Sequence, residues 1–285
     1  MSVAAGHPVI INADDLGLSD SVTAGILEAL EKGWVSDSSL MAPGDAFPQA
    51  AAGLKAMGRR HVGVHLTLVD RELPMAPPEQ IPLLLGPDAR FPLRRNVLIA
   101  RAAAFPRKIL AQVEREWRLQ LRRLLEAGLT VSHLDSHQHL HLLPGLAELA
   151  LTLAREAGIP FVRVPRFRAL TAGRPVSLAV NLLAARLERL ARRAGIGTVD
   201  GAGVEDSGRQ SLEALTRLLD ARSRGVLEIG LHPGRVDAAT ATKYAHWGFS
   251  WEEELACLAG PAMARQLAQR GRATVSFATL AAHAG

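Results

Sequence analysis

The sequence contains little that could cross-link the chain or carry it across a membrane. Cys257 is the only cysteine among 285 residues, which excludes an internal disulfide framework and a cysteine-based metal site. No run of about eighteen apolar residues occurs, so a membrane-spanning helix is not expected. The first residues lack the charged and then apolar pattern of a signal peptide. We therefore expect a cytoplasmic globular protein.

Aromatic residues are also scarce, at 4% of the chain, although the protein is basic, with a formal net charge of +5. A basic chain can bind nucleic acid, but single-stranded nucleic acid is usually bound by aromatic side chains interleaved with basic ones. Here the arginines fall on expected helices instead. We expect no nucleic-acid partner, and an anionic lipid surface is the better match for the positive charge.

Short apolar runs alternate with amphipathic segments along the whole chain. Strand-type runs such as Pro8–Asn12 and Val62–Leu68 are rich in branched aliphatic residues, which is typical of strands buried on both faces. This alternation predicts an α/β fold, a (β/α) barrel of seven or eight strands. The length suits one domain spanning residues 1–285.

The densest polar motif lies between Ser132 and His141, where four of the ten histidines accompany one aspartate. His133, Asp135, His137, His139 and His141 all occupy odd positions, and an extended backbone places alternate side chains on the same face. Neutral imidazole is a common metal ligand and titrates near neutral pH. The run therefore predicts a metal or acid–base site. A polar strand end with solvated histidines is the alternative.

Other polar residues follow the ends of other predicted strands. The carboxyl ends of parallel strands meet at one rim of a barrel, where such folds carry their chemistry. Adjacent side chains on a strand diverge, so one aspartate of the first pair could bind metal while the other accepts a proton. An arginine near a carboxylate would keep it ionised. The alternative roles are helix capping for the aspartate pair, core packing for the histidine of the third strand and a surface ion pair for the arginines. The residues concerned are Asp14, Asp15, His65, Arg163, Arg166 and His232.

Four segments give weaker predictions. Arg71–Phe105 contains six prolines, so we expect neither a helix nor a central strand to run through it, and interpret it as an insertion over the barrel mouth, either a lid or an inert loop. Gly195–Gly208 is glycine-rich and uninformative. Gly234–Ser250 is expected to be a loop, and Ala273–Phe277 a final strand.

The segment Val176–Ala194 predicts an amphipathic helix studded with arginines. Its apolar stripe would pack in the outer layer of a barrel. Alternatively, Arg189, Arg192 and Arg193 would place it on an anionic lipid surface. The stripe consists of Val176, Val180, Leu183, Leu187 and Leu190.

Four motifs together resemble the YdjC/ChbG family of carbohydrate deacetylases. They lie in the family's order and span nearly the whole chain. The motifs are Asn12-Ala13-Asp14-Asp15-Leu16-Gly17, Gly63-Val64-His65-Leu66, His133 through His141, and Leu231-His232-Pro233.

The resemblance implies a distorted (β/α) barrel that removes an N-acetyl group from a sugar with the help of a divalent metal ion. It implies Asp15, His65 and His137 as the metal ligands, Asp14 as the general base and His232 as the acid. Three protein ligands would leave positions open for a water and the acetyl oxygen. The ion could be zinc or magnesium, and intrinsic affinity favours zinc.

Within the family, the run His65–Asp70 followed by the proline-rich insertion is similar to the hopanoid-biosynthesis branch, which acts on acetylglucosaminyl lipids. The tripeptide His137-Gln138-His139 is also similar to the chitooligosaccharide branch. The expected substrate is therefore an acetylated amino sugar or an acetylglucosaminyl glycolipid, and a homo-oligomer is also expected.

Two further functions remain open on the sequence. One is another metal-dependent barrel hydrolase such as a phosphoesterase, for which His139 and His141 could hold a second ion. The other is a non-enzymatic metal- or lipid-binding protein that uses the basic helix.

Overall fold

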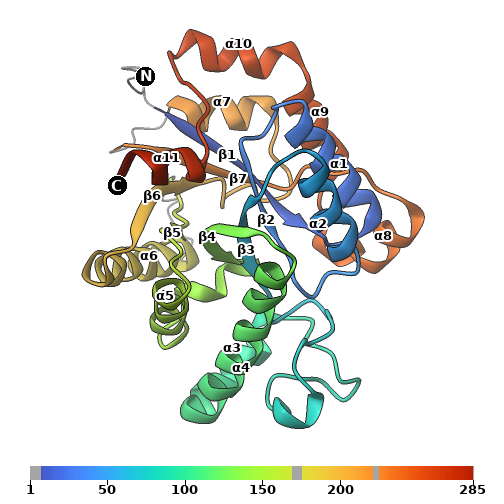
Figure 1. The fold of residues 1–285 in the computed structure, drawn as a ribbon, viewed down its shortest axis with the longest axis vertical. Coiled ribbons are helices and arrows are strands. Elements are labelled where there is room, and N and C mark those ends of the chain that lie inside the picture. Colours follow the sequence, from blue (N-terminus) through green and yellow to red (C-terminus); the bar gives the residue numbers. More distant parts are fainter. Residues whose placement is uncertain (1–7, 169–174, 221–224, 285) are drawn as a thin grey trace.

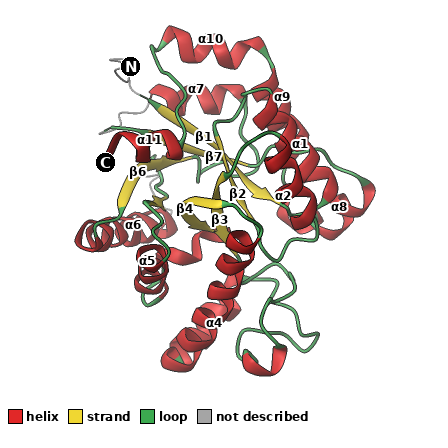
Figure 2. Ribbon diagram, viewed as in Figure 1, coloured by secondary structure: helices red, strands yellow, loops and turns green. Residues whose placement is uncertain are grey.

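Seven parallel strands close into a barrel at the centre of the molecule, with helices around it (Figure 1 and Figure 2). The computed structural model describes residues 8–168, 175–220 and 225–284. Each strand pairs with the next one in sequence, and β7 closes the barrel by pairing with β1. The predicted (β/α) barrel is confirmed, with seven strands. They are β1 (Val9–Leu16), β2 (Asp37–Leu40), β3 (His61–Leu66), β4 (Thr130–Ser136), β5 (Phe161–Val164), β6 (Gly197–Ala202) and β7 (Leu227–Leu231).

Helices cover the outside of the barrel and bury one face each. On α4, for example, Ile109, Val113, Trp117 and Leu124 recur at helical spacing and are buried. No helix in the described ranges is long and apolar enough to cross a bilayer. The α-helices are α1 (Asp20–Glu31), α2 (Phe47–Ala56), α3 (Arg95–Ala104), α4 (Pro106–Glu126), α5 (Leu146–Glu156), α6 (Pro175–Ala194), α7 (Leu212–Asp220), α8 (Ala238–Lys243), α9 (Trp251–Ala259), α10 (Pro261–Gln269) and α11 (Phe277–Ala284). Three short 3-10 helices are η1 (Pro78–Gln80), η2 (His137–Leu142) and η3 (Ala245–Trp247).

The predicted outer-layer position of α6 is confirmed for most of its apolar stripe. Leu187 is buried, and Val180, Leu183 and Leu190 pack against the core. Val176, at the beginning of the helix, is instead 56% exposed.

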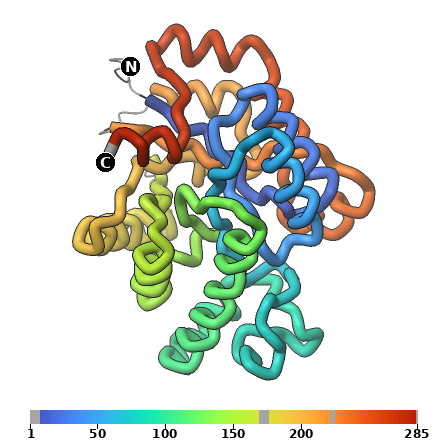
Figure 3. The backbone as a smooth tube through the Cα atoms, viewed as in Figure 1, coloured from blue at the N-terminus to red at the C-terminus, as the bar shows by residue number. Residues whose placement is uncertain are grey.

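Two segments near the closure of the barrel differ from the sequence interpretation. The uninformative glycine-rich stretch contains β6, where a Cβ on Gly201 would lie 2.5 Å from the Val164 carbonyl oxygen of β5. Glycine there permits close strand packing rather than a loop. The predicted strand Ala273–Phe277 is wrong: it forms one parallel bridge, between Thr274 and Val9, before α11 begins. Figure 3 shows this C-terminal segment running beside the start of β1.

The proline-rich insertion is more regular than predicted. Its six prolines all precede Arg95, so no proline interrupts α3, which forms in the last part of the segment. The insertion is anchored by the buried Glu116 of α4, which accepts hydrogen bonds from the backbone amides of Met75 and Ala76 at 2.9 and 2.8 Å.

The segment Gly234–Ser250 is also not only a loop, because it contains α8 and η3. Asp237 caps α8 by accepting a hydrogen bond from the Thr240 amide at 2.7 Å. The segment returns over the rim of the barrel and brings Trp247 against the His137 ring, with 4.8 Å between ring centroids.

Candidate metal centre

An irregularity near the end of β1 accompanies two adjacent aspartates that are both buried at the carboxyl rim. The pairing of β1 with β2 shifts register between Ala13 and Leu16, and Asp15 adopts a left-handed conformation with φ of 63°. Aspartate tolerates this conformation better than most residues. Both carboxylates are buried, and each lies 4.0 Å from Nε2 of His232. The other contacts of the two side chains differ: both oxygens of Asp14 accept hydrogen bonds from Arg163, whereas Oδ1 of Asp15 lies near His65 and His137.

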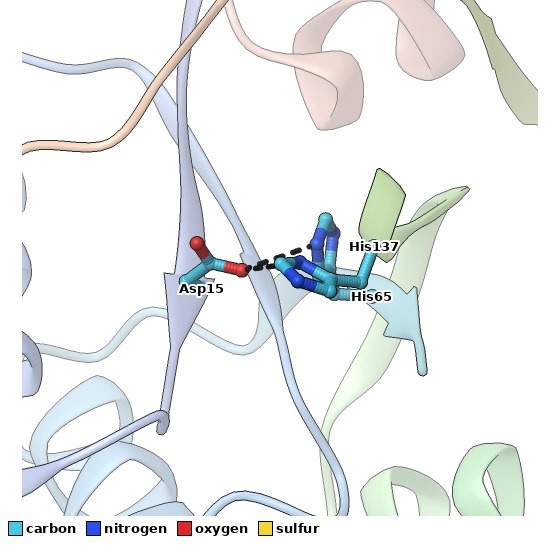
Figure 4. A group of neighbouring side chains, drawn as sticks. All are labelled: Asp15, His65 and His137. Carbon is cyan, nitrogen blue, oxygen red and sulfur yellow. Dashed lines mark hydrogen bonds and ion pairs between the residues drawn. The ribbon is translucent and has the colours of Figure 1, made fainter. Parts of the chain in front are cut away.

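Asp15 of β1, His65 of β3 and His137, the first residue after β4, converge at the carboxyl rim (Figure 4). Oδ1 of Asp15 lies 3.3 Å from Nε2 of His65 and 3.1 Å from Nδ1 of His137. One donor atom from each side chain lies within 4.8 Å of the others. The structure thus brings together the three residues that the family resemblance implied as ligands.

The donor atoms of this group suit a divalent cation. Nε2 of His65 and Oδ2 of Asp15 are buried and find no hydrogen-bond partner within the described ranges. Buried polar atoms are rarely left unpaired, and an ion that the structure does not contain is one common reason. A carboxylate with two imidazoles is a ligand set that zinc and related ions accept.

The far nitrogen of each histidine is held by a second carboxylate. Nδ1 of His65 lies 2.8 Å from Oδ1 of Asp135, and Nε2 of His137 lies 2.8 Å from Oδ2 of Asp70. Such contacts fix the tautomer and orientation of a metal-binding imidazole. Burial lowers the pKa of His65, but Asp135 and Asp15 outweigh burial and raise it to about 9. For His137 burial is likewise outweighed, by Asp15 and Asp70, so its pKa is raised.

Arg163 joins three buried carboxylates beneath this group. It donates to both oxygens of Asp14 at 2.5 and 2.8 Å, lies 2.9 Å from Asp135 and donates to Glu228 at 2.7 Å. Burial raises the pKa of Asp14, but the charge and hydrogen bonds of Arg163 together with the charge of His65 outweigh burial and leave that pKa lowered. Arg166 is not brought to Asp14. It lies within salt-bridge distance of Glu188 and Asp200.

His232 follows β7, the strand that pairs with β1, and therefore lies beside the two aspartates. Its backbone amide donates to Oε2 of Glu254 at 2.5 Å, and its ring packs on Phe249 with centroids 4.7 Å apart. These contacts hold the imidazole at the edge of the metal-binding group.

The histidine row does not continue as one extended strand. β4 ends at Ser136, and Gln138 and His139 take left-handed conformations with φ of 52° and 56°. Only His133 and Asp135 therefore follow strand alternation. His141 contacts Ser136 and the Arg163 carbonyl through its two ring nitrogens, which leaves neither free for a second ion. His133 stacks on Phe277 of α11, with 4.0 Å between ring centroids.

A cavity of about 360 Å³ opens beside the metal-binding group. Asp14, His65, His137 and His232 line its polar end. Its other walls are largely apolar and come from α3, η2, α6 and the segment after η3. Wall residues include Ile99, Leu142, Val176, Val180, Leu183 and Phe249.

Sequence reasoning gave no role to Asp70, Glu228 or Glu254. Glu228 is flanked by Leu227 and Ile229 in an apolar strand, and a carboxylate in such a place is a signal of a buried partner. Burial raises its pKa and Arg163 lowers it, with a net rise to about 7. Asp70 and Glu254 carry no such signal, because only the fold brings them to His137 and His232.

The fold and the site together define a class of protein. It is a closed parallel barrel whose carboxyl rim carries a buried Asp-His-His group beside a cavity. The comparisons with known proteins give the family: the chain belongs to the YdjC-like family, whose model matches residues 8–269.

Several similar relatives are carbohydrate deacetylases. The one from Geobacillus stearothermophilus is 30% identical over 277 residues, covering 94% of this chain and 96% of the relative. The one from Mus musculus is 30% identical, covering 92% of this chain and 91% of the relative. A third, from Brevibacillus brevis, is 38% identical over 157 residues, covering 55% of this chain and 59% of the relative. The resemblance of the sequence motifs to this family is confirmed.

Solved structures agree on the fold. A putative cellobiose-phosphate cleavage protein from Enterococcus faecalis V583 superposes with a TM-score of 0.76 at 24% identity. The match covers 97% of this chain and 99% of that one.

Proposed function

We propose that this protein is a metal-dependent carbohydrate N-deacetylase. The observation that carries the proposal is the convergence of Asp15, His65 and His137 beside the Arg163-bound carboxylate of Asp14. This arrangement places a metal-binding group and a candidate base at one end of a cavity. The relatives named above support the same reaction class.

Asp15, His65 and His137 would hold the ion. When bound there, a divalent ion polarises a carbonyl oxygen and lowers the pKa of a water molecule. Asp135 and Asp70 would keep the two imidazoles oriented through their far nitrogens. We propose zinc rather than magnesium, because imidazole nitrogen suits zinc and magnesium prefers oxygen ligands and retained waters.

Asp14 and His232 would handle the protons of amide hydrolysis. Because Arg163 lowers the pKa of Asp14, this carboxylate is ionised at neutral pH and could accept a proton from the attacking water. His232 lies at the end of the neighbouring strand, 4.0 Å from both aspartates, and could donate a proton to the departing amine nitrogen. Each such transfer contributes typically ~10²–10⁴-fold to a rate. Arg163 would act by positioning Asp14. Arg166 has no role in this proposal, because its guanidinium forms an ion pair with Glu188 instead of contacting Asp14.

We propose further that the substrate is an acetylglucosaminyl glycolipid. The cavity walls beyond the polar end are largely apolar, and α3 of the proline-rich insertion supplies part of them. An amino sugar at the metal-binding end would leave an attached apolar group in contact with Ile99, Val180 and Leu183. This supports the insertion as a substrate-shaping element over the barrel mouth.

The test is acetate release from N-acetylglucosamine derivatives with and without an alkyl aglycone. Metal-free protein, prepared with a chelator, should release no acetate, and adding zinc or magnesium should restore release. The alkyl-bearing substrate should have the lower KM. Phosphate release from a generic ester, without acetate release, would favour the phosphoesterase instead.

We also propose one catalytic domain over residues 1–285, located in the cytoplasm, and a homo-oligomer. Limited proteolysis and light scattering of the purified protein test the domain and the oligomer.

A further inference from the structure

Exposed large apolar side chains gather on two segments of this protein. Among the described residues nine such side chains are exposed, and seven of them belong to residues 93–105 or 176–182. The seven are Leu93, Val97, Ile99, Phe105, Val176, Leu178 and Leu182. Single exposed apolar residues are ordinary on a protein surface, but a concentration of them marks an interaction site.

The helix α3 is unusually free of the protein body. Of its ten residues only Leu98 is buried, while Val97 and Ile99 are 40% and 39% exposed. A surface helix normally buries an apolar stripe. On α6, the deeper stripe packs on the core, whereas Leu178 and Leu182 are 55% and 63% exposed. Both helices therefore carry apolar side chains that contact no core.

The two segments meet at the mouth of the cavity. Ile99 from α3 and Val176 from α6 line the same cavity as His65 and His137. Two of the seven exposed apolar side chains therefore line the cavity of the metal-binding group, and the other five belong to the same two segments. We call residues 93–108 and 176–182 together the mouth face.

Positive charge accompanies these apolar residues. Residues 93–108 include no aspartate or glutamate. Four exposed basic side chains lie among them, namely Arg94, Arg95, Arg107 and Lys108. Exposed apolar side chains beside basic ones are typical of helices that lie in the interface of an anionic membrane.

We propose that the mouth face docks on an anionic lipid bilayer. The positive charge favours this partner over a second copy of the chain. In a two-fold dimer the basic surfaces of the two copies would face and repel each other. Docking itself does not depend on the proposed function. Its role does, because docking would let a lipid-borne sugar enter the cavity directly from the membrane.

The surface differs from the one that the sequence suggested. Arg189, Arg192 and Arg193 lie toward the C-terminal end of α6, beyond the exposed apolar residues. Arg192 also lies 3.6 Å from Glu188 of its own helix. The double variant Arg192→Gln/Arg193→Gln is therefore a matched control for charge removal outside the mouth face.

The experiment is co-sedimentation with vesicles of phosphatidylcholine, with or without phosphatidylglycerol. The protein should bind the anionic vesicles and not the neutral ones, and more weakly at high salt. Arg107→Gln/Lys108→Gln should weaken binding by about fivefold per charge removed. Val97→Ser/Leu178→Ser/Leu182→Ser should abolish it, and the control variant should bind like the unmodified protein. All of these side chains lie on the surface, so thermal unfolding should confirm that each variant folds.

Three outcomes would overturn the docking proposal. They are no binding to anionic vesicles, equal loss of binding in the control variant, or a dimer in light scattering that the apolar triple variant dissociates. Acetate release from a water-soluble substrate, measured on the same samples, keeps the proposed reaction separate. Activity without vesicle binding refutes the docking alone, and vesicle binding without activity refutes the reaction alone.

Discussion

Replacing each of the two adjacent aspartates by asparagine should separate proton transfer from metal binding. Asp15 supplies one oxygen that lies within 3.3 Å of a nitrogen of each histidine, whereas Asp14 is bound by Arg163 through both of its oxygens. The change Asp14→Asn should therefore remove the proton acceptor but leave the three ligands in place. The change Asp15→Asn should remove a ligand.

The expected sizes follow from these contacts. Loss of a general base typically costs ~10²–10⁴-fold in rate, or about 2.7–5.4 kcal/mol of transition-state stabilisation. Metal affinity should change by less than roughly tenfold in Asp14→Asn, while in Asp15→Asn it should fall by roughly a hundredfold or more. Arg163 keeps Asp135 and Glu228 as partners in the first variant, so the protein should still fold.

The assay measures acetate release from an N-acetylglucosamine derivative and metal binding by calorimetry on the same preparations. Asp20→Asn is a suitable control, since Asp20 is an exposed aspartate at the start of the following helix. It should retain both activity and metal. If Asp14→Asn loses the ion as well as the activity, the roles assigned to the two aspartates are wrong.

Three further predictions concern the surroundings of the site. Asp70→Asn should weaken metal binding by about 10–100-fold, because it alters the partner of the His137 Nε2 atom; calorimetry that shows unchanged affinity would contradict this. Burial raises the pKa of Asp37 to about 7, so the native state keeps its proton to higher pH than the unfolded chain, and stability should fall as pH rises from about 4 through 7. Asp37→Asn should remove that part of the pH dependence, at most roughly 4 kcal/mol by the 1.36 kcal/mol per pKa unit, as urea unfolding at pH 5 and pH 8 would show. Gly63→Ala should destabilise the fold by about 1–3 kcal/mol, because the new Cβ would lie 2.3 Å from Nε2 of the buried His133; an unchanged melting temperature would refute the clash.

Local patterns were enough to predict much of the barrel. Branched apolar runs predicted the strands that contain Asp14 and His65, because strands buried on both faces need continuous apolar sequence. Residues at the strand ends were correctly grouped at one rim, since parallel strands share a direction. Helix α3 and strand β6 were not predicted. The number of prolines was taken for the whole insertion, although all of them come before α3 begins. The glycine Gly201 of β6 allows close packing against β5 and does not form a turn.

The sequence by itself determined which side chains could meet, because the order of strands in a parallel barrel follows the order of the chain. Only the tertiary structure decided how they meet. A register shift accompanies the left-handed conformation of Asp15, and two further left-handed residues ended the histidine row after Asp135. Arg163 rather than Arg166 reached Asp14. Backbone irregularities and contacts between distant strands are set by packing in three dimensions, and sequence spacing carries no record of them.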